Sequence, residues 1–394
     1  MTASTFEQLL AAKEIVVTCG SGGVGKTTMA AALGTMAATH FGGKVLVLTV
    51  DPARRLAGAL GLEAFGNVER QVPREAFATA GIEPRGEMWV AMLDTKQSWD
   101  DLIRRHAPDA HTRDTILVNP LYNNITGRFV QSHDYIAMER LYEIHSSGRY
   151  DLVVVDTPPT RNALDFLDAP ARMAEFFGGR LLRWLTLPYR VGGKRSMRMI
   201  NFASRPFYQL ADRVLGSKFL EDIAEFFLNF QSMYEGFVER AQSVERLLHD
   251  RRTTFAVVTT LEAAPLYEAE NFCAVLRDRG YHLGALVLNK TLPDTLLDAD
   301  GAAAAAGFVE QAGPLADALT ALPNPALADA ARTARVLRTV GESYANFSVV
   351  AKREAELRAE LARVPDVVVR IPGFEHDISD VESLVAICDA LFAQ

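Results

Sequence analysis

Gly20-Ser-Gly-Gly-Val-Gly25-Lys26-Thr27 is the stretch that decides the fold of this 394-residue chain. It fits the pattern G-x-x-x-x-G-K-[ST], in which a glycine-rich turn cradles a phosphate group. It follows the β-branched run of residues 14–19 and precedes a stretch of small, helix-tolerant residues at 27–39. The predicted order is therefore strand, loop, helix, which is the context that a phosphate-binding loop requires.

Each residue type in this loop suits the binding of a phosphate group and its metal ion. The glycines let the backbone wrap a phosphate, so that N–H groups and a helix N-terminus point at it. The Lys26 amine then reaches the β- and γ-phosphates, and the Thr27 hydroxyl is a ligand for Mg²⁺. The nucleotide-binding residues predicted from this segment are Gly20, Ser21, Gly22, Gly23, Val24, Gly25, Lys26, Thr27 and Thr28.

Further apolar runs recur along the chain, mostly separated by segments long enough for helices. They lie at residues 44–50, 88–93, 151–156, 254–260, 283–289 and 366–371. Strands that alternate with helices predict an α/β fold, a mainly parallel sheet with helices on both faces. Ligands bind outside the carboxyl ends of the strands in such sheets, so site residues are expected directly after these runs.

Two aspartates follow runs at that predicted edge. Asp156 ends a buried strand and is predicted to hold Mg²⁺ through water. Asp51 follows the second run, and we predict that it positions or deprotonates the attacking water. The structural alternative for Asp51 is a cap on the turn before Pro52. The predicted metal-site residues are Thr27, Asp51 and Asp156.

Composition limits the class of protein. Hydrophobic residues make up 49% of the chain and charged residues 23%, which is typical of a soluble globular protein. The net charge of −8 disfavours nonspecific binding to nucleic acid. The three cysteines lie far apart and form no C-x-x-C pair, which disfavours a disulfide framework or a cysteine zinc site.

The expected location is the cytoplasm. The first residues lack the basic and apolar regions of a signal peptide. No stretch approaches the roughly 20 apolar residues needed to cross a bilayer. Any contact with a membrane is therefore expected to be peripheral.

Two regions interrupt the alternation and are predicted to be helical insertions in a single domain that spans 1–394. They are residues 97–147 and 165–252, and the second holds ten of the 21 phenylalanines. Between Glu175 and Asp212 this second insertion carries basic residues and no acid. Its aromatic and Met side chains either fill a core of their own or form a groove for an apolar helix or an anionic lipid surface.

Taken together, three motifs resemble those of the arsenite-pump and tail-anchored-protein-targeting ATPases, a branch of the deviant Walker A P-loop proteins. They are the loop through Thr28, Asp51-Pro-Ala, and Asp156-Thr-Pro-Pro-Thr160. Later segments are similar as well, namely Glu262 with Tyr267-Glu268-Ala-Glu270, the strand end at Asn289, and Ile371-Pro372-Gly373. The resemblance spans nearly the whole chain and is weakest in the helical insertions.

The resemblance implies a P-loop NTPase sheet and an Mg²⁺-dependent ATPase that binds ATP and forms a homo- or heterodimer with a related ATPase subunit. It implies that Asp51 orients the hydrolytic water, that Asp156 begins the second switch, and that Asn289 and Pro372 contact adenine. Loss of the γ-phosphate would then move the switches and reshape a helical subdomain. The two insertions are the candidate for that subdomain, with a hydrophobic protein client or a membrane surface as its partner.

The sequence departs from the family pattern at Ser21, where the resemblance expects a lysine that reaches across the dimer to the partner's phosphates. Arginine fingers at such positions contribute roughly 10³ to 10⁵ in rate. We predict that Arg161, directly after the second switch, is the catalytic cation beside Lys26 and Asp51; Arg54, Arg55 or a partner subunit are the alternatives.

Paired zinc cysteines after Asn289 and an arsenite-binding cysteine triad are also missing, which disfavours a zinc-clasped homodimer and arsenite extrusion.

Two functions of different classes remain open. The first is an ATPase whose nucleotide cycle switches a subdomain that handles a hydrophobic or membrane-associated protein. The second is an ATP-binding regulatory or scaffold subunit that hydrolyses little and is active only in a heteromer. They differ in whether another cation replaces the lysine that is absent at Ser21.

Overall fold

The computed structural model describes residues 6–50, 57, 58, 60, 62, 67–120, 122, 123, 126, 130–157, 167–169, 171, 172, 175, 226, 229, 230, 233–322, 324, 327–361, 365–374, 376–378 and 380–392. An eight-stranded sheet forms the centre, in the order β3-β4-β2-β5-β1-β6-β7-β8. All neighbouring strands are parallel except β3 and β4, which pair antiparallel. The predicted mainly parallel α/β sheet is therefore confirmed.

The strands coincide with the apolar runs of the sequence to within two residues at each end. They are β1 (Ile15–Cys19), β2 (Lys44–Thr49), β4 (Glu87–Met92), β5 (Leu152–Asp156), β6 (Thr253–Thr259), β7 (Leu283–Thr291) and β8 (Val367–Pro372). The sequence did not predict β3 (Arg70–Gln71), because two exposed polar residues carry no strand pattern.

Helices cover both faces of this sheet. The described helices are α1 (Phe6–Ala11), α2 (Lys26–His40), α4 (Arg74–Ala78), α5 (Thr95–His106), α6 (Ala110–Val118), α8 (Val130–Ser146), α14 (Tyr234–Leu248), α15 (Ala263–Asp278), α16 (Ala299–Glu310), α17 (Ala312–Thr320), α18 (Ala330–Leu361) and α19 (Val381–Phe392). A 3-10 turn, η2, spans Asp294–Leu297. None of the described helices is both long enough and apolar enough to span a membrane.

The alternation of β1 assigns each helix layer to one face. Ile15, Val17 and Cys19 belong to a core shared with α5, α8, α14 and α15. Val16 belongs to the opposite core, which α1, α2, α4 and α19 cover. Both cores are fully buried at β1, so this strand has the two-sided apolar pattern of a central parallel strand.

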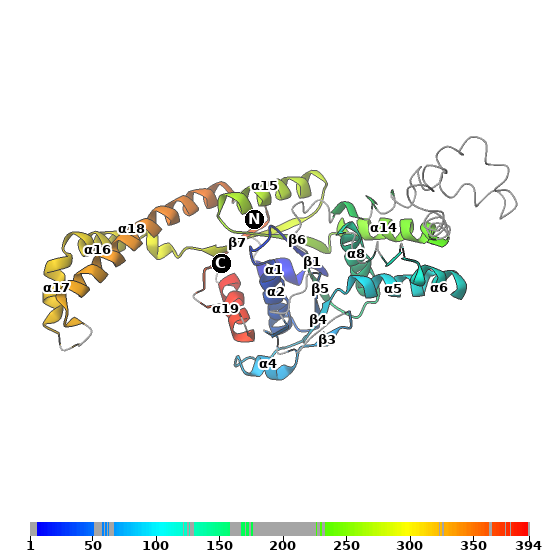
Figure 1. Cartoon of the computed structure of the whole chain (residues 1–394), viewed down its shortest axis with the longest axis horizontal. Helices are drawn as coiled ribbons and strands as arrows, with labels where there is room; N and C mark the ends of the chain where they lie inside the picture. Colours follow the sequence, from blue (N-terminus) through cyan, green and yellow to red (C-terminus); the bar gives the residue numbers. More distant parts are fainter. Residues whose placement is uncertain are drawn as a thin grey trace.

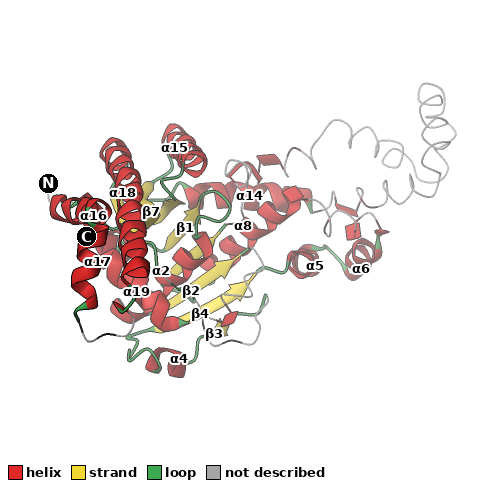
Figure 2. Cartoon of the chain, turned by 60° about the vertical axis from the view of Figure 1, so that its left-hand side comes forward, coloured by secondary structure: helices red, strands yellow, loops and turns green. Residues whose placement is uncertain are grey.

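Two groups of helices extend beyond the sheet (Figures 1 and 2). Helices α5, α6 and α8 fall within or beside the first predicted insertion, and α14 lies in the second; most of 165–252 lies outside the described residues. On the other side, α16, α17 and the outer part of α18 form an arm that projects away from the sheet (Figure 1). The sequence did not predict the 32-residue helix α18.

Candidate functional site

The glycine-rich loop lies at the carboxyl end of β1, in the middle of the sheet. Gly20, Gly23 and Gly25 have φ values of 147°, 80° and 98°, a region that L side chains rarely adopt. A Cβ atom at Gly20 would collide with the carbonyl of Val258 in β6, and one at Gly25 with the side-chain amide of Asn289 in β7. The loop therefore needs glycine because it turns sharply against two neighbouring strands.

Lys26 is the first residue of α2 and is 7% exposed. Its Nζ atom donates a hydrogen bond to the carbonyl oxygen of Ser21, at 2.8 Å, so the side chain folds back along the loop. Thr27 and Thr28 follow in the first turn of the same helix. A glycine loop, a helix N-terminus and a lysine thus meet in one place, which is the arrangement that phosphate-binding loops use.

Asp156 ends β5, directly beside β1, and is fully buried. It pairs in register with Thr18 of β1 on one side and with Thr49 of β2 on the other. The Thr49 hydroxyl donates to Asp156 Oδ2 at 2.9 Å, which fixes the orientation of the carboxylate. Asp156 is therefore held one strand away from the loop, at the edge where the sequence predicts a metal-binding acid.

Two predicted catalytic residues, Asp51 and Arg161, lie outside the described residues, as do Arg54 and Arg55. Thr49 and Val50, just before Asp51, are described, and the Val50 amide donates to the carbonyl of Asp156 at 3.1 Å. The chain thus enters the segment after β2 beside Asp156. Within the described part of the chain, no group of three or more His, Cys, Asp or Glu side chains is arranged to hold a metal ion.

Asn289 brings β7 against the loop. Its Nδ2 donates to the carbonyl of Val24 at 2.7 Å, and its Oδ1 accepts from the Lys290 amide at 2.9 Å. Pro372 lies at the end of the adjacent strand β8, where the Gly373 amide donates to the carbonyl of Thr291 at 3.1 Å. The two predicted base-contacting residues therefore lie on neighbouring strands at the carboxyl edge.

Two contacts of the loop were not predicted from the sequence. The Ser21 hydroxyl donates to a carboxylate oxygen of Glu268 in α15. Lys290 has a φ of 58°, in the left-handed region, and its Nζ lies 3.4 Å from the carbonyl oxygen of Gly23. Ser21, where the resemblance leads us to expect a lysine, therefore faces an acid, and Lys290 approaches the loop from β7.

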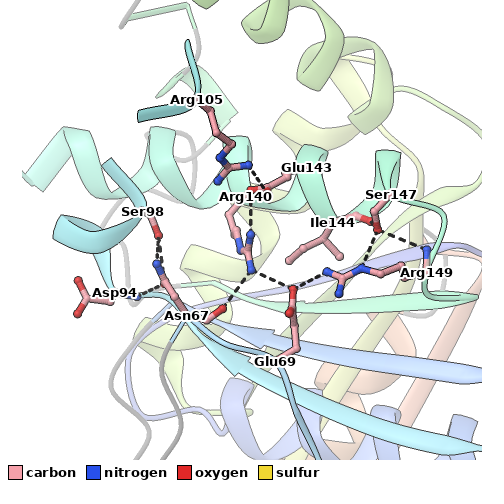
Figure 3. A network of polar contacts seen from close by, with 10 residues as sticks. All are labelled: Asn67, Glu69, Asp94, Ser98, Arg105, Arg140, Glu143, Ile144, Ser147 and Arg149. Atoms are coloured by element: carbon pink, nitrogen blue, oxygen red, sulfur yellow. Dashed lines mark hydrogen bonds and ion pairs between the residues drawn. The ribbon is translucent and has the colours of Figure 1, made fainter. Parts of the chain in front are cut away.

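A polar network holds the chain where it returns from the segment after Asp51 (Figure 3). Arg140 of α8 donates from Nη2 to the carbonyl of Asn67 at 3.0 Å and to Glu69 Oε1 at 2.9 Å. Its Nη1 donates to Glu143 Oε2 at 2.8 Å. The side-chain Oδ1 of Asn67 accepts from the Asp94 amide at 2.7 Å. Residues 67–69 are thereby fastened to α8 and to the start of α5.

Comparison with known proteins matches residues 13–305 of this chain to the family model described as anion-transporting ATPase. The matched region begins just before β1 and ends within α16. It therefore includes the glycine-rich loop, Asp156 and Asn289, and it excludes Pro372.

Individual relatives are distant in sequence. The ATPase ASNA1 homolog of Entamoeba dispar is 25% identical over 285 residues, which cover 70% of this chain and 75% of that protein. The putative arsenical pump-driving ATPase 1 of Aquifex aeolicus is 23% identical over 296 residues, covering 72% of this chain and 64% of that protein. The ATPase GET3 of Komagataella phaffii is 25% identical over 283 residues, covering 69% and 71%.

Proposed function

The chain belongs to the anion-transporting ATPase family, and from this premise we propose that it is an Mg²⁺-dependent ATP hydrolase whose nucleotide cycle switches a helical subdomain. The observation that carries the proposal is the loop between β1 and α2. Its glycines at positive φ, the helix N-terminus and Lys26 converge on one point, and the buried Asp156 lies one strand away. A bound nucleotide supplies the γ-phosphate whose loss drives such switches.

In this proposal Thr27, Asp51 and Asp156 serve Mg²⁺, and Asp51 orients the attacking water. Asn289 and Pro372 contact the base. The Asn289 amide supports this role because it lies directly against the loop, on the strand next but one to β1. Lys26 and Arg161 are proposed to supply the cationic charge at the phosphates.

We propose further that the two insertions, 97–147 and 165–252, form one subdomain. Trp99 and Tyr135 of the first insertion stack with ring centroids 5.7 Å apart, and Phe237 of the second lies 6.2 Å from Trp99 and 6.0 Å from Tyr135. Arg240 Nε of α14 lies 2.5 Å from Glu139 Oε1 of α8, and both side chains are largely buried. Shared packing and a buried ion pair make independent movement of the two insertions costly.

The partner of this subdomain is proposed to be a hydrophobic or membrane-associated protein, and the chain itself to work as a dimer with a second copy or a related ATPase subunit. This proposal rests on the motif resemblance to the tail-anchored-protein-targeting ATPases, and the relatives include proteins named ATPase GET3 and arsenical pump-driving ATPase. The described phenylalanines of the second insertion, Phe226, Phe230 and Phe237, are buried, which favours a core role for these three.

An ATP-binding scaffold with little hydrolysis is the second candidate, and the Ser21–Glu268 contact favours it. Serine brings no positive charge to the phosphates, and the carboxylate of Glu268 adds a negative charge beside the loop. Without a substituting cation, the transition state of phosphoryl transfer would lack one of its usual stabilising charges.

The deciding experiment measures steady-state ATP hydrolysis with Mg²⁺ for the wild type, Asp51→Asn and Asp317→Asn, with nucleotide-dependent size measurements on the same samples. Asp317 is exposed on α17 and serves as the matched control. We expect Asp51→Asn to lower kcat at least 100-fold, a typical loss for a general base, and Asp317→Asn to leave kcat unchanged. Tight ATP binding with no turnover that depends on Asp51 would contradict hydrolysis and support the scaffold.

A further inference from the structure

Helix α18 carries a row of apolar side chains on its exposed side. Val336, Val340, Phe347 and Val350 are 54%, 50%, 53% and 48% exposed. With Ser343 between them, these residues follow one another at intervals of four, three, four and three along the helix. That spacing is the heptad pattern of a coiled-coil seam, and it favours a second helix as the occupant.

A neighbouring face of α18 is already packed. Thr333, Gly341, Ser348 and Ala351 are buried on that face. A Cβ atom at Gly341 would clash with the carbonyl of Ala305 in α16, so the two helices approach closely there. The arm thus uses small side chains to bury one face of α18 and leaves larger apolar side chains exposed beside it.

The charges of α18 are separated along its length. The first half carries Arg332, Arg335 and Arg338 and no acid before Glu342. Glu342 also lies in the first half, and the other acids of the helix, Glu354, Glu356 and Glu360, lie in the second half together with Lys352, Arg353 and Arg358. An antiparallel copy of the same helix places Arg332, Arg335 and Arg338 beside the half that holds three of the four acids, whereas a parallel copy aligns these arginines with one another.

The arm leaves this face accessible to another molecule. Figure 1 shows α16, α17 and the outer part of α18 projecting from the sheet, on the side away from α5, α6 and α8. The match to the family model ends at residue 305, before α17 and α18 begin. The seam therefore belongs to a part of this chain that the family match does not cover.

We infer that α18 is a self-association surface, in which the seam of Val336, Val340, Ser343, Phe347 and Val350 packs antiparallel against the same seam of a second copy of this chain. From Val336 to Val350 the seam spans 14 steps of about 1.5 Å, or roughly 21 Å. An isologous contact of this length buries less than the roughly 1,200–2,000 Å² of a standard interface, so the dimer dissociates in the micromolar range.

The test is sedimentation equilibrium of the full chain without nucleotide, comparing the wild type with Phe347→Glu and Val349→Glu. Val349 is 68% exposed and lies on another side of the same helix, so its variant is the matched control. We expect Phe347→Glu to raise the dimer dissociation constant at least tenfold and Val349→Glu to leave it within twofold of the wild type. Circular dichroism and thermal unfolding check that both variants fold.

A wild type that stays monomeric at about 100 µM, or equal dissociation constants for the two variants, would overturn the proposal. Sedimentation of the wild type, but not of Phe347→Glu, with anionic vesicles and without self-association would assign the seam to a lipid surface instead. Because the two variants differ only on α18 and the measurement omits nucleotide, the difference between their dissociation constants reports on the seam and not on the dimer proposed for the ATPase cycle.

Orientation is tested by thiol crosslinking of Val336→Cys and Val350→Cys, one of them carrying a mass tag. The native cysteines are all buried, so they compete little for a short bismaleimide. An antiparallel pair brings opposite ends of the seam together, and we expect mixed dimers to crosslink far more than either variant alone. Crosslinking of each variant with itself would show a parallel pair and refute the antiparallel arrangement.

Discussion

Ser21 occupies the position at which the resemblance in sequence leads us to expect a lysine. Its hydroxyl is bonded to Glu268, and its carbonyl accepts from Lys26. The Ser21 side chain therefore takes no part in the hydrogen bond between Lys26 Nζ and the Ser21 carbonyl. A longer, charged side chain at position 21 can replace the hydroxyl without removing the contact between Lys26 and the loop backbone.

We expect Ser21→Lys to raise kcat for ATP at least tenfold if the missing cation limits the rate, because a preorganised positive charge stabilises the transferring phosphoryl group. Ser21→Met, of similar length and without charge, is the control and should not raise kcat. The measurement is steady-state hydrolysis at saturating ATP and Mg²⁺. An unchanged rate in Ser21→Lys would mean that another cation, such as the proposed Arg161, already acts there.

His282 predicts a pH dependence of stability. Burial lowers its pKa below the ordinary value of 6.5, and Lys13 lowers it further, against the opposing effect of Asp366. The Nδ1 atom lies 2.8 Å from the Thr254 hydroxyl and Nε2 lies 3.0 Å from Asp366. Because the folded protein favours neutral His282, this contribution to stability is complete above pH 6.5 and is lost as the pH falls through the lowered folded pKa.

The expected outcome is that His282→Gln loses less free energy of unfolding than the wild type between pH 7.5 and pH 5. Urea unfolding at several pH values measures the difference. His111→Gln, at an exposed position on α6, should follow the wild-type curve. Parallel curves for His282→Gln and the wild type would show that His282 does not contribute.

At the scale of elements, α8 connects two parts of the molecule. Arg140 holds the backbone and side chain of residues 67–69, and the adjacent Glu139 pairs with Arg240 of α14. The helix therefore contacts both the end of the segment that contains Asp51 and the described end of the second insertion. We therefore expect a displacement at one of these contacts to shift the other, because both lie on the same helix.

Arg140→Ala is expected to lower the free energy of unfolding by about 2–4 kcal/mol, because it leaves Glu69 and the Asn67 carbonyl without this donor in a largely buried place. Arg149→Ala is the matched control. Arg149 donates to the same Glu69 Oε1, at 2.8 Å, but its side chain is 55% exposed. Its loss should cost less than about 1 kcal/mol. Equal costs in urea unfolding would contradict the difference in burial as the cause.

Element by element, the sequence predicted what depends on local pattern. The strands carry β-branched runs between turn residues, and their parallel order brings the loop, Asp156 and Asn289 to one edge. Helix α18 escaped prediction because its buried face is made of small residues such as Gly341 and Ala351. Large apolar residues usually mark the buried face of a helix, whereas the valines of α18 lie on its exposed side.

Contacts between segments that are distant along the chain could not be predicted from the sequence. The Ser21–Glu268 bond joins residues 247 positions apart, and it depends on where α15 begins relative to the loop. Lys290 approaches the loop because its backbone adopts a left-handed conformation, which no propensity favours for lysine. Asp51 and Arg161 remain predictions because they lie outside the described residues.

On the scale of the whole molecule, the order of the strands along the chain determines when the glycine-rich loop can be enclosed. The glycine loop closes against Val258 of β6 and Asn289 of β7, yet both strands are encoded after the helical insertions. During translation, the loop is synthesised before β6 and β7, so the strands that enclose it are still missing. We therefore expect the loop to bind its ligand only after the ribosome has synthesised β7.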